Sequence, residues 1–118
     1  MNIEQLKTLC SRWQEKLGLA HWNIALQICR ERDMPISHSQ GANQISLANE
    51  QALISILDSS DFPSSPFEQD MEVSLVHELL HIPLRYISEP ENGSIEETLL
   101  EAFIERTARL LVLLSRGN

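Results

Sequence analysis

Long hydrophobic runs are missing from this sequence. The longest uninterrupted apolar stretch is Leu110–Leu114, far short of the roughly 20 residues that a membrane-spanning helix needs. The opening residues Met1–Gln5 contain an acid and no base, whereas a secretory leader carries Lys or Arg before its apolar segment. We therefore expect a chain that makes no membrane contact and works in the cytoplasm.

Basic residues are scarce. The sequence has 9 Lys and Arg against 17 Asp and Glu, which gives a formal net charge of −8 at pH 7. A surface of that sign repels a phosphate backbone, and no cluster of Lys or Arg reverses it locally. The composition therefore argues against nucleic acid as a partner.

Cysteine is scarce as well. The two cysteines, Cys10 and Cys29, are not needed as a disulfide staple because a chain of 118 residues can bury a sufficient core. We interpret them as small buried hydrophobic residues in a reducing compartment. A content of 42% hydrophobic and 22% charged residues is typical of one globular domain, which we place over residues 1–118.

Apolar periodicity predicts one helix and three strands in the first half of the chain. Apolar side chains recur at three- and four-residue spacings from Ile3 to Leu17, which indicates an amphipathic helix. From Trp22 to Ile28 they alternate with other residues, which indicates a half-buried strand. Two short strand candidates, Asn43–Ala48 and Ala52–Leu57, are separated by a turn, and we expect them to form a hairpin.

Two further helices are predicted in the second half. The first begins at Pro66 with Ser65 as its N-cap and ends near Ile82, because the following proline disfavours helical geometry there. Ser94 opens the second, which runs to about Ser115. The order of helix, three strands, helix and helix is an α+β fold with a small three-stranded sheet.

The helix that begins at Pro66 carries the sequence His77-Glu78-Leu79-Leu80-His81. Histidines four positions apart lie on one face of a helix, one turn apart, so both imidazoles can bind one ion. Zinc suits them because it takes imidazole nitrogens at ~2.0–2.1 Å in a tetrahedral shell. Glu78 lies beside His77, where it can take a proton from a metal-bound water without being a ligand.

The residues around this motif are mostly apolar, which favours a buried site. They are Val73, Leu75, Val76, Leu79, Leu80 and Ile82. Burying two imidazoles and a carboxylate without partners would be costly, and a metal removes that cost. The alternative is a pair of surface histidines on an acidic helix.

A catalytic zinc of this kind needs a third protein ligand and one open position. No histidine follows His81, so a downstream ligand must be a carboxylate. The last helix offers Glu96, Glu97, Glu101 and Glu105. Glu101 falls on the apolar stripe of that helix and is expected to point toward the partner helix, while Glu97 and Glu105 lie one turn to either side.

The pattern His77-Glu78-Xaa-Xaa-His81, with Glu101 twenty positions after the second histidine, is similar to the gluzincin clan of thermolysin-like zinc metallopeptidases. The chain resembles the single-domain minigluzincins, and similar cores occur in SprT-like and phage-encoded zincins. The resemblance implies a zincin-like domain that uses Zn2+ to hydrolyse a peptide or protein substrate. It implies that Glu101 is the third ligand and that Glu105 orients His77 through its other ring nitrogen.

The resemblance leaves the group that stabilises the oxyanion unassigned. Tyr86, His38 and Arg85 are the candidates, and Tyr86 is our first choice because it is the only tyrosine and follows the motif closely. We expect the strand Ala52–Leu57 to lie nearest the cleft and to pair with an extended peptide. Thermolysin-like enzymes carry a second subdomain that supplies a histidine and a tyrosine, and we expect those parts to be absent or replaced here.

Other classes of function remain open. The chain could be a non-catalytic zinc domain that serves as a regulatory or interaction module in a phage or toxin-like setting. It could also be a self-inhibited enzyme or a homodimer, since the apolar tail Leu110–Leu114 could pack on itself or on a partner chain. A di-iron bundle would use Glu78 and His81, but the second Glu-x-x-His element that it requires is missing.

Overall fold

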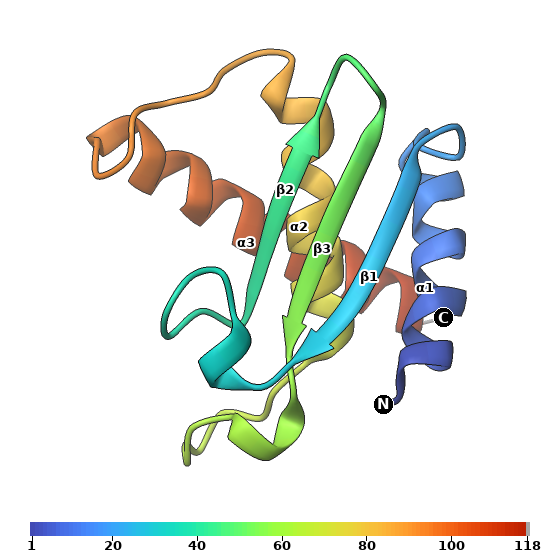
Figure 1. Ribbon diagram of the computed structural model, residues 1–118. Helices are drawn as coiled ribbons and strands as arrows, with labels where there is room; N and C mark the ends of the chain where they lie inside the picture. Colours follow the sequence, from blue (N-terminus) through green and yellow to red (C-terminus); the bar gives the residue numbers. More distant parts are fainter. Residues whose placement is uncertain (118) are drawn as a thin grey trace.

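The computed structural model describes residues 1–117 and has the expected α+β fold. Residue 118, the last of the expected domain, lies outside the described residues. The main elements are α1 (Ile3–Lys16), β1 (Asn23–Cys29), β2 (Gly41–Ser46), β3 (Gln51–Leu57), α2 (Met71–Arg85) and α3 (Ile95–Arg116). Helices α1 and α2 pack against the sheet, and α3 packs on α2 (Figure 1). The order of helix, three strands, helix and helix is confirmed.

The sheet has the strand order β1-β3-β2. The hairpin is confirmed, because β2 and β3 pair antiparallel with Ser46 opposite Gln51. Strand β1 then pairs parallel with β3, which places β3 in the centre of the sheet. The expectation that this strand pairs with a peptide is therefore wrong: both of its edges already hold neighbours, and β2 is an edge strand instead.

The start of α2 differs from the prediction. Its N-cap is Asp70, whose side chain accepts hydrogen bonds from the backbone N–H groups of Glu72 and Val73. Ser65 caps only a local turn, since its hydroxyl accepts from the backbone N–H of Phe67. A carboxylate that satisfies two amides and carries negative charge at a helix N-terminus is the stronger cap.

The end of α2 also differs, because the helix continues through Pro83 to Arg85. Proline costs one helical hydrogen bond, but Ile82 is fully buried and this packing keeps the last turn helical. The start of α3 is as expected, with the Ser94 hydroxyl accepting from the backbone N–H of Glu97 at 3.1 Å.

The core lies between the sheet and the helices, and α2 is its centre. Leu75, Val76 and Leu79 of this helix are fully buried. Trp13 and Trp22 are buried, and the indole N–H of Trp13 donates to Glu72 Oε2 at 2.7 Å. This packing fixes the rotation of α2 and so determines which of its side chains face away from the core.

The two cysteines are both free thiols, Cys10 buried and Cys29 half-buried. Within residues 1–117, no helix combines the length and the apolar character that crossing a membrane would demand.

Candidate metal centre

Helix α2 places two histidines side by side. His77 and His81 are four residues apart, so they project from the same face on successive turns, and their ring centroids lie 5.3 Å apart. Both side chains are mostly shielded, with 17% and 15% of their surface exposed. The helix thus presents two imidazoles at the edge of the core.

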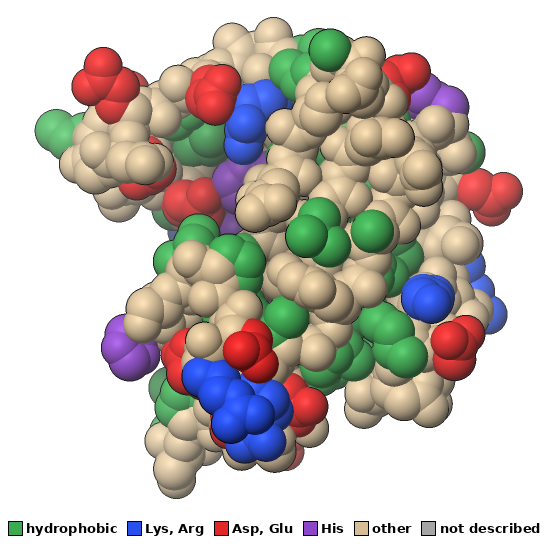
Figure 2. All heavy atoms as spheres, viewed as in Figure 1, with side chains coloured by type: hydrophobic (Ala, Val, Ile, Leu, Met, Phe, Trp, Pro, Cys, Tyr) green, Lys and Arg blue, Asp and Glu red, His purple; other side chains and the backbone are tan. Residues whose placement is uncertain are grey.

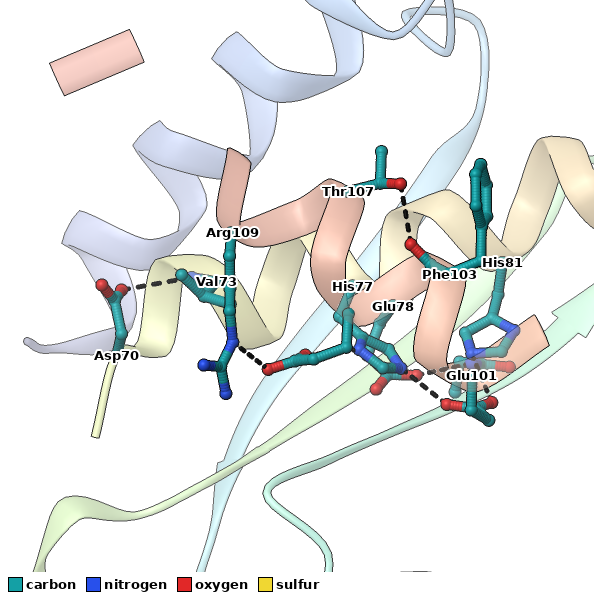
Figure 3. Close-up of polar contacts among 11 residues, drawn as sticks. Asp70, Val73, His77, Glu78, His81, Glu101, Phe103, Thr107 and Arg109 are labelled. Atoms are coloured by element: carbon teal, nitrogen blue, oxygen red, sulfur yellow. Dashed lines mark hydrogen bonds and ion pairs between the residues drawn. The ribbon is translucent and has the colours of Figure 1, made fainter. Parts of the chain in front are cut away.

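Helix α3 brings Glu101 to both imidazoles. The fully buried Ile104 and Ala108 face α2, and Glu101 lies one and two turns before them on the same side. Its Oε2 lies 2.9 Å from His77 Nε2 and its Oε1 lies 3.0 Å from His81 Nε2 (Figure 3). These three residues, the metal group, each offer a ligand atom within 4.8 Å of the others, so the group could hold a metal ion.

Glu105 lies on the other side of the His77 ring. Its Oε1 is 2.8 Å from His77 Nδ1, while its Oε2 accepts a hydrogen bond from Arg109 Nε at 2.7 Å. Burial raises the pKa of Glu105, but the hydrogen bonds from His77 and Arg109 outweigh it and the pKa is lowered. A carboxylate held in this way fixes the orientation of the His77 ring, so that its Nε2 faces Glu101.

Glu78 points toward β2 and is nearly buried, with 6% of its surface exposed. Its Oε1 accepts a hydrogen bond from Asn43 Nδ2 at 2.6 Å. A Cβ at Gly41 would lie 2.9 Å from Glu78 Oε2 and 3.3 Å from its Cγ, so any larger residue would force the carboxylate to move. Burial raises the pKa of Glu78, although the charge of His77 and the hydrogen bond from Asn43 oppose the shift.

The contribution of β2 was missed by sequence reasoning. Residues two apart on a strand share a face, so Gly41 and Asn43 approach α2 together. Asn43 did not stand out, because Gln44 and Ser46 of the same strand are polar too, and the sequence did not show which strand lies beside α2.

The pKa values of the two imidazoles shift in opposite directions. Burial lowers the pKa of His77, but the charge of Glu78 and the hydrogen bonds to the two α3 carboxylates outweigh it, so this pKa is raised. Burial also lowers the pKa of His81, and the neighbouring imidazole adds to the effect, so this pKa falls despite the nearby Glu101. The two imidazoles therefore differ in their affinity for a proton, although both rings contact the Glu101 carboxylate.

The metal group lies in a cleft of about 750 Å3. Figure 2 shows the hollow, with histidine and acidic side chains at its base. Its walls come from the loop before β2, from β2, from α2 and from α3, and include His38, Gly41, Asn43, Ser74, Glu78, Arg85, Glu97, Glu105 and Arg109. A second hollow of about 880 Å3 adjoins it and shares Ser74, Glu105 and Arg109.

Comparison with known proteins gives no match. No protein-family model, no curated protein and no solved structure matches this chain. The interpretation of the site therefore rests on its own geometry and chemistry.

The structure separates the three candidates for oxyanion stabilisation. Tyr86 is the C-cap of α2, is 60% exposed, and is not among the residues that line the cleft. Arg85 lines the cleft and contacts Glu89 at 3.2 Å. His38 also lines it, held by its backbone N–H, which donates to Glu31 Oε1. Arg85 and His38 are therefore better placed than Tyr86.

Neither spare carboxylate of α3 joins the metal group. Glu97 lines the cleft, but its Oε1 accepts a hydrogen bond from the backbone N–H of Gly93. Glu96 is exposed on a different side of the helix. Within the part of the chain that the structure describes, His77, His81 and Glu101 are the one set of three side chains at metal-binding distance.

Proposed function

We propose that this chain is a zinc-dependent metallopeptidase of the gluzincin type, an endopeptidase that hydrolyses peptide bonds in a peptide or protein substrate. The observation that carries the proposal is the metal group, whose ligand atoms lie within 4.8 Å of one another beside the buried Glu78. Three protein ligands at the wall of an open cleft are typical of a catalytic zinc site, whereas structural sites are closed by four.

The donor set suits zinc, which commonly binds two imidazole nitrogens and one carboxylate oxygen. Tetrahedral zinc at bond lengths of ~2.0–2.1 Å keeps neighbouring ligand atoms about 3.3 Å apart. Glu101 lies 2.9 and 3.0 Å from the two imidazole nitrogens. These two distances involve different carboxylate oxygens, and the three ligand atoms lie within 4.8 Å of one another, so the side chains would close inward around the ion.

The mechanism divides the work between the ion and the chain. Zinc, when bound, supplies a Lewis acid that polarises a peptide carbonyl and lowers the pKa of water to about 7. Glu78 accepts the proton of the attacking water and returns it to the leaving amine. Its raised pKa suits both steps, because a base works best when its pKa approaches the working pH. Asn43 holds this carboxylate by hydrogen bonding to one oxygen.

Strand β2 is the element best placed to bind the substrate backbone. It lies at the end of the sheet, so one of its edges pairs with β3 and the other is not used by the sheet. Gly41 and Asn43 of this strand line the cleft that holds the metal group. An extended peptide could add to this edge through main-chain hydrogen bonds. Arg85 and His38 lie in the same cleft and could stabilise the carbonyl oxygen as it gains charge.

The decisive test is the substitution Glu78→Gln. We expect this variant to retain about one zinc per chain, measured by elemental analysis, and to lose cleavage of an unfolded protein by at least about a hundredfold. Glu96→Gln is the matched control and should change neither quantity, because Glu96 lies outside the metal group. Loss of zinc from Glu78→Gln would show that Glu78 is a ligand and would contradict its role as a base.

The second candidate is a non-catalytic or self-inhibited zinc domain that regulates or binds another molecule. It is favoured by the position of Tyr86 outside the cleft, which leaves the site without its first-choice partner for the oxyanion. Full zinc loading with no cleavage of any unfolded protein between about pH 5 and 9 would support this candidate over the enzyme.

A further inference from the structure

Helix α3 has a second apolar face, which lies away from α2. Its side chains recur every three, four or seven residues along the helix, so they form one stripe. They are Ile95, Leu99, Phe103, Leu110 and Leu113, with exposed fractions from 52% for Leu110 to 75% for Ile95. We call this surface the outer α3 face.

The outer face and the metal group use opposite sides of the same helix. Ile104, Ala108 and Val112 are buried on the side toward α2, and Glu101 lies on that side too. In Figure 3 the ring of Phe103 points away from the imidazoles and carboxylates of the site. A molecule bound to the outer face would therefore leave the cleft open.

The outer face is comparable in area with the largest apolar patch on a typical monomer. A Leu, Ile or Phe side chain that is more than half exposed leaves on the order of 100 Å2 in water, so the five side chains together expose several hundred Å2. The largest apolar patch on a typical monomer is about 300–600 Å2. Each partner of a standard protein interface buries about 800 Å2, so the apolar side chains of this face would form only the centre of such an interface, with polar neighbours around them.

Two charged residues on this face are arranged symmetrically. Glu96 and Arg106 are equally distant in sequence from position 101, and so are Leu99 and Phe103. When two copies of α3 align antiparallel about this position, residues 95–107 of the two helices lie side by side, and Leu110 and Leu113 extend past the start of the partner's helix. Leu99 then meets Phe103 of the second copy, and Glu96 meets Arg106 of the second copy. Among the described residues, neither the Glu96 carboxylate nor the Arg106 guanidinium has a hydrogen bond or an ion pair within its own chain.

We propose that two copies of this chain associate through the outer α3 face, with their α3 helices antiparallel. Leu99 and Phe103 of both copies form the centre, and two Glu96–Arg106 pairs flank it. A parallel arrangement would place like charges together, which is unfavourable. An anionic lipid surface is a poorer occupant because the chain carries a net charge of −8.

The first experiment measures the mass of the zinc-loaded chain by sedimentation equilibrium between about 1 and 100 μM, the range in which weak dimers dissociate. We expect a dimer of the 13.4 kDa chain. Phe103→Glu should raise the dimer dissociation constant by at least about a hundredfold. Ile87→Glu is the matched control, since Ile87 is 81% exposed but lies outside the outer face, and it should have no effect. Circular dichroism establishes that both variants are folded.

The second experiment tests the antiparallel arrangement by charge reversal. Glu96→Arg and Arg106→Glu should each raise the dissociation constant about tenfold, and the double variant should return it to within about threefold of the original value. A chain that stays monomeric at 100 μM, or a dimer that Phe103→Glu leaves intact, would overturn the proposal. A dimer that the double charge reversal fails to restore would overturn the antiparallel pairing. Zinc content and cleavage are measured separately, so these outcomes do not depend on the proposed activity.

Discussion

Two clusters of charged side chains join α2 to α3, and they are completed in different ways. Near the start of α2, Asp70 and Glu72 meet Arg116 from the end of α3; we call these three residues the Arg116 cluster. Arg116 Nη1 lies 2.7 Å from Asp70 Oδ2, and Arg116 Nη2 lies 2.8 Å from Glu72 Oε1. The Trp13 indole also donates to Glu72. This cluster carries its own cation and has a donor for each carboxylate.

The metal group lies farther along the same pair of helices, and among residues 1–117 no Lys or Arg side chain forms an ion pair with any of its three members. Glu101 contacts two imidazoles, while Glu78 and Glu105 add negative charge on either side. Arg109 pairs with Glu105, which is outside the metal group. The Arg116 cluster therefore balances its own charges and joins the two helices. The metal group and its neighbouring carboxylates carry an excess of negative charge, which a divalent cation would neutralise.

The largest expected effect comes from supplying the cation that the metal group lacks. With free zinc about a thousandfold above its dissociation constant, binding should stabilise the fold by about 4 kcal/mol and raise the Tm by more than about 10 °C. Differential scanning calorimetry with and without a chelator measures the shift. His81→Ala should abolish the shift and His21→Ala should preserve it, because His21 pairs with Glu50 and does not belong to the metal group. An equal shift in both variants would place the zinc elsewhere.

A smaller effect on stability is expected from disrupting the Arg116 cluster. Arg116→Ala removes the guanidinium from Asp70 and from Glu72, which is 7% exposed. We expect it to lower the free energy of unfolding by about 2 kcal/mol, since it leaves a buried carboxylate with fewer donors. The exposed Arg12→Ala should change that free energy by less than about 0.5 kcal/mol. Denaturant unfolding of the metal-free protein measures both.

Zinc content sharpens the contrast between the two clusters. Arg116→Ala should retain the zinc of the parent chain, because no member of the Arg116 cluster belongs to the metal group. If the substitution lowers the zinc content as well as the stability, then the Arg116 cluster and the metal group are coupled through α3 and are not independent.

The local part of the site could be predicted from the sequence, because it depends on helical periodicity alone. The spacing of His77 and His81 fixes their common face, and the apolar stripe of α3 indicated that Glu101 faces α2. The structure brings these side chains together at metal-binding distance. The same reasoning marked Glu105 as a neighbour one turn away, and its carboxylate lies 2.8 Å from His77.

The non-local part could not be predicted in the same way. The pairing of β1 with β3 joins segments far apart in the chain, and nothing in the alternation of apolar residues shows which strand stays at the edge. Asn43 and Gly41 could therefore not be assigned to the site. The N-cap of α2 was missed because Ser65 and Asp70 are both good caps. Asp70 is also paired with Arg116 at the end of α3, a contact that local sequence patterns do not reveal.

The smallest expected effect is the loss, at low pH, of the stability that the Arg116 cluster contributes. Burial raises the pKa of Asp70, but hydrogen bonds from Arg116 and from backbone amides outweigh it and the pKa is lowered. A lowered pKa in the folded state stabilises the protein fully above the unfolded value of about 3.9, and this stability is lost as the pH falls through the folded value.

The difference in unfolding free energy between the parent chain and Arg116→Ala should therefore narrow as the pH falls from 5 to 3. We expect a change of no more than about 1 kcal/mol, because the pair is partly exposed and screened by solvent. Both proteins are measured with a chelator, so that titration at the metal group cancels in the difference. If this difference in unfolding free energy stays constant down to pH 2.5, then Arg116 stabilises the fold by packing its aliphatic stem, and its ion pair with Asp70 contributes nothing.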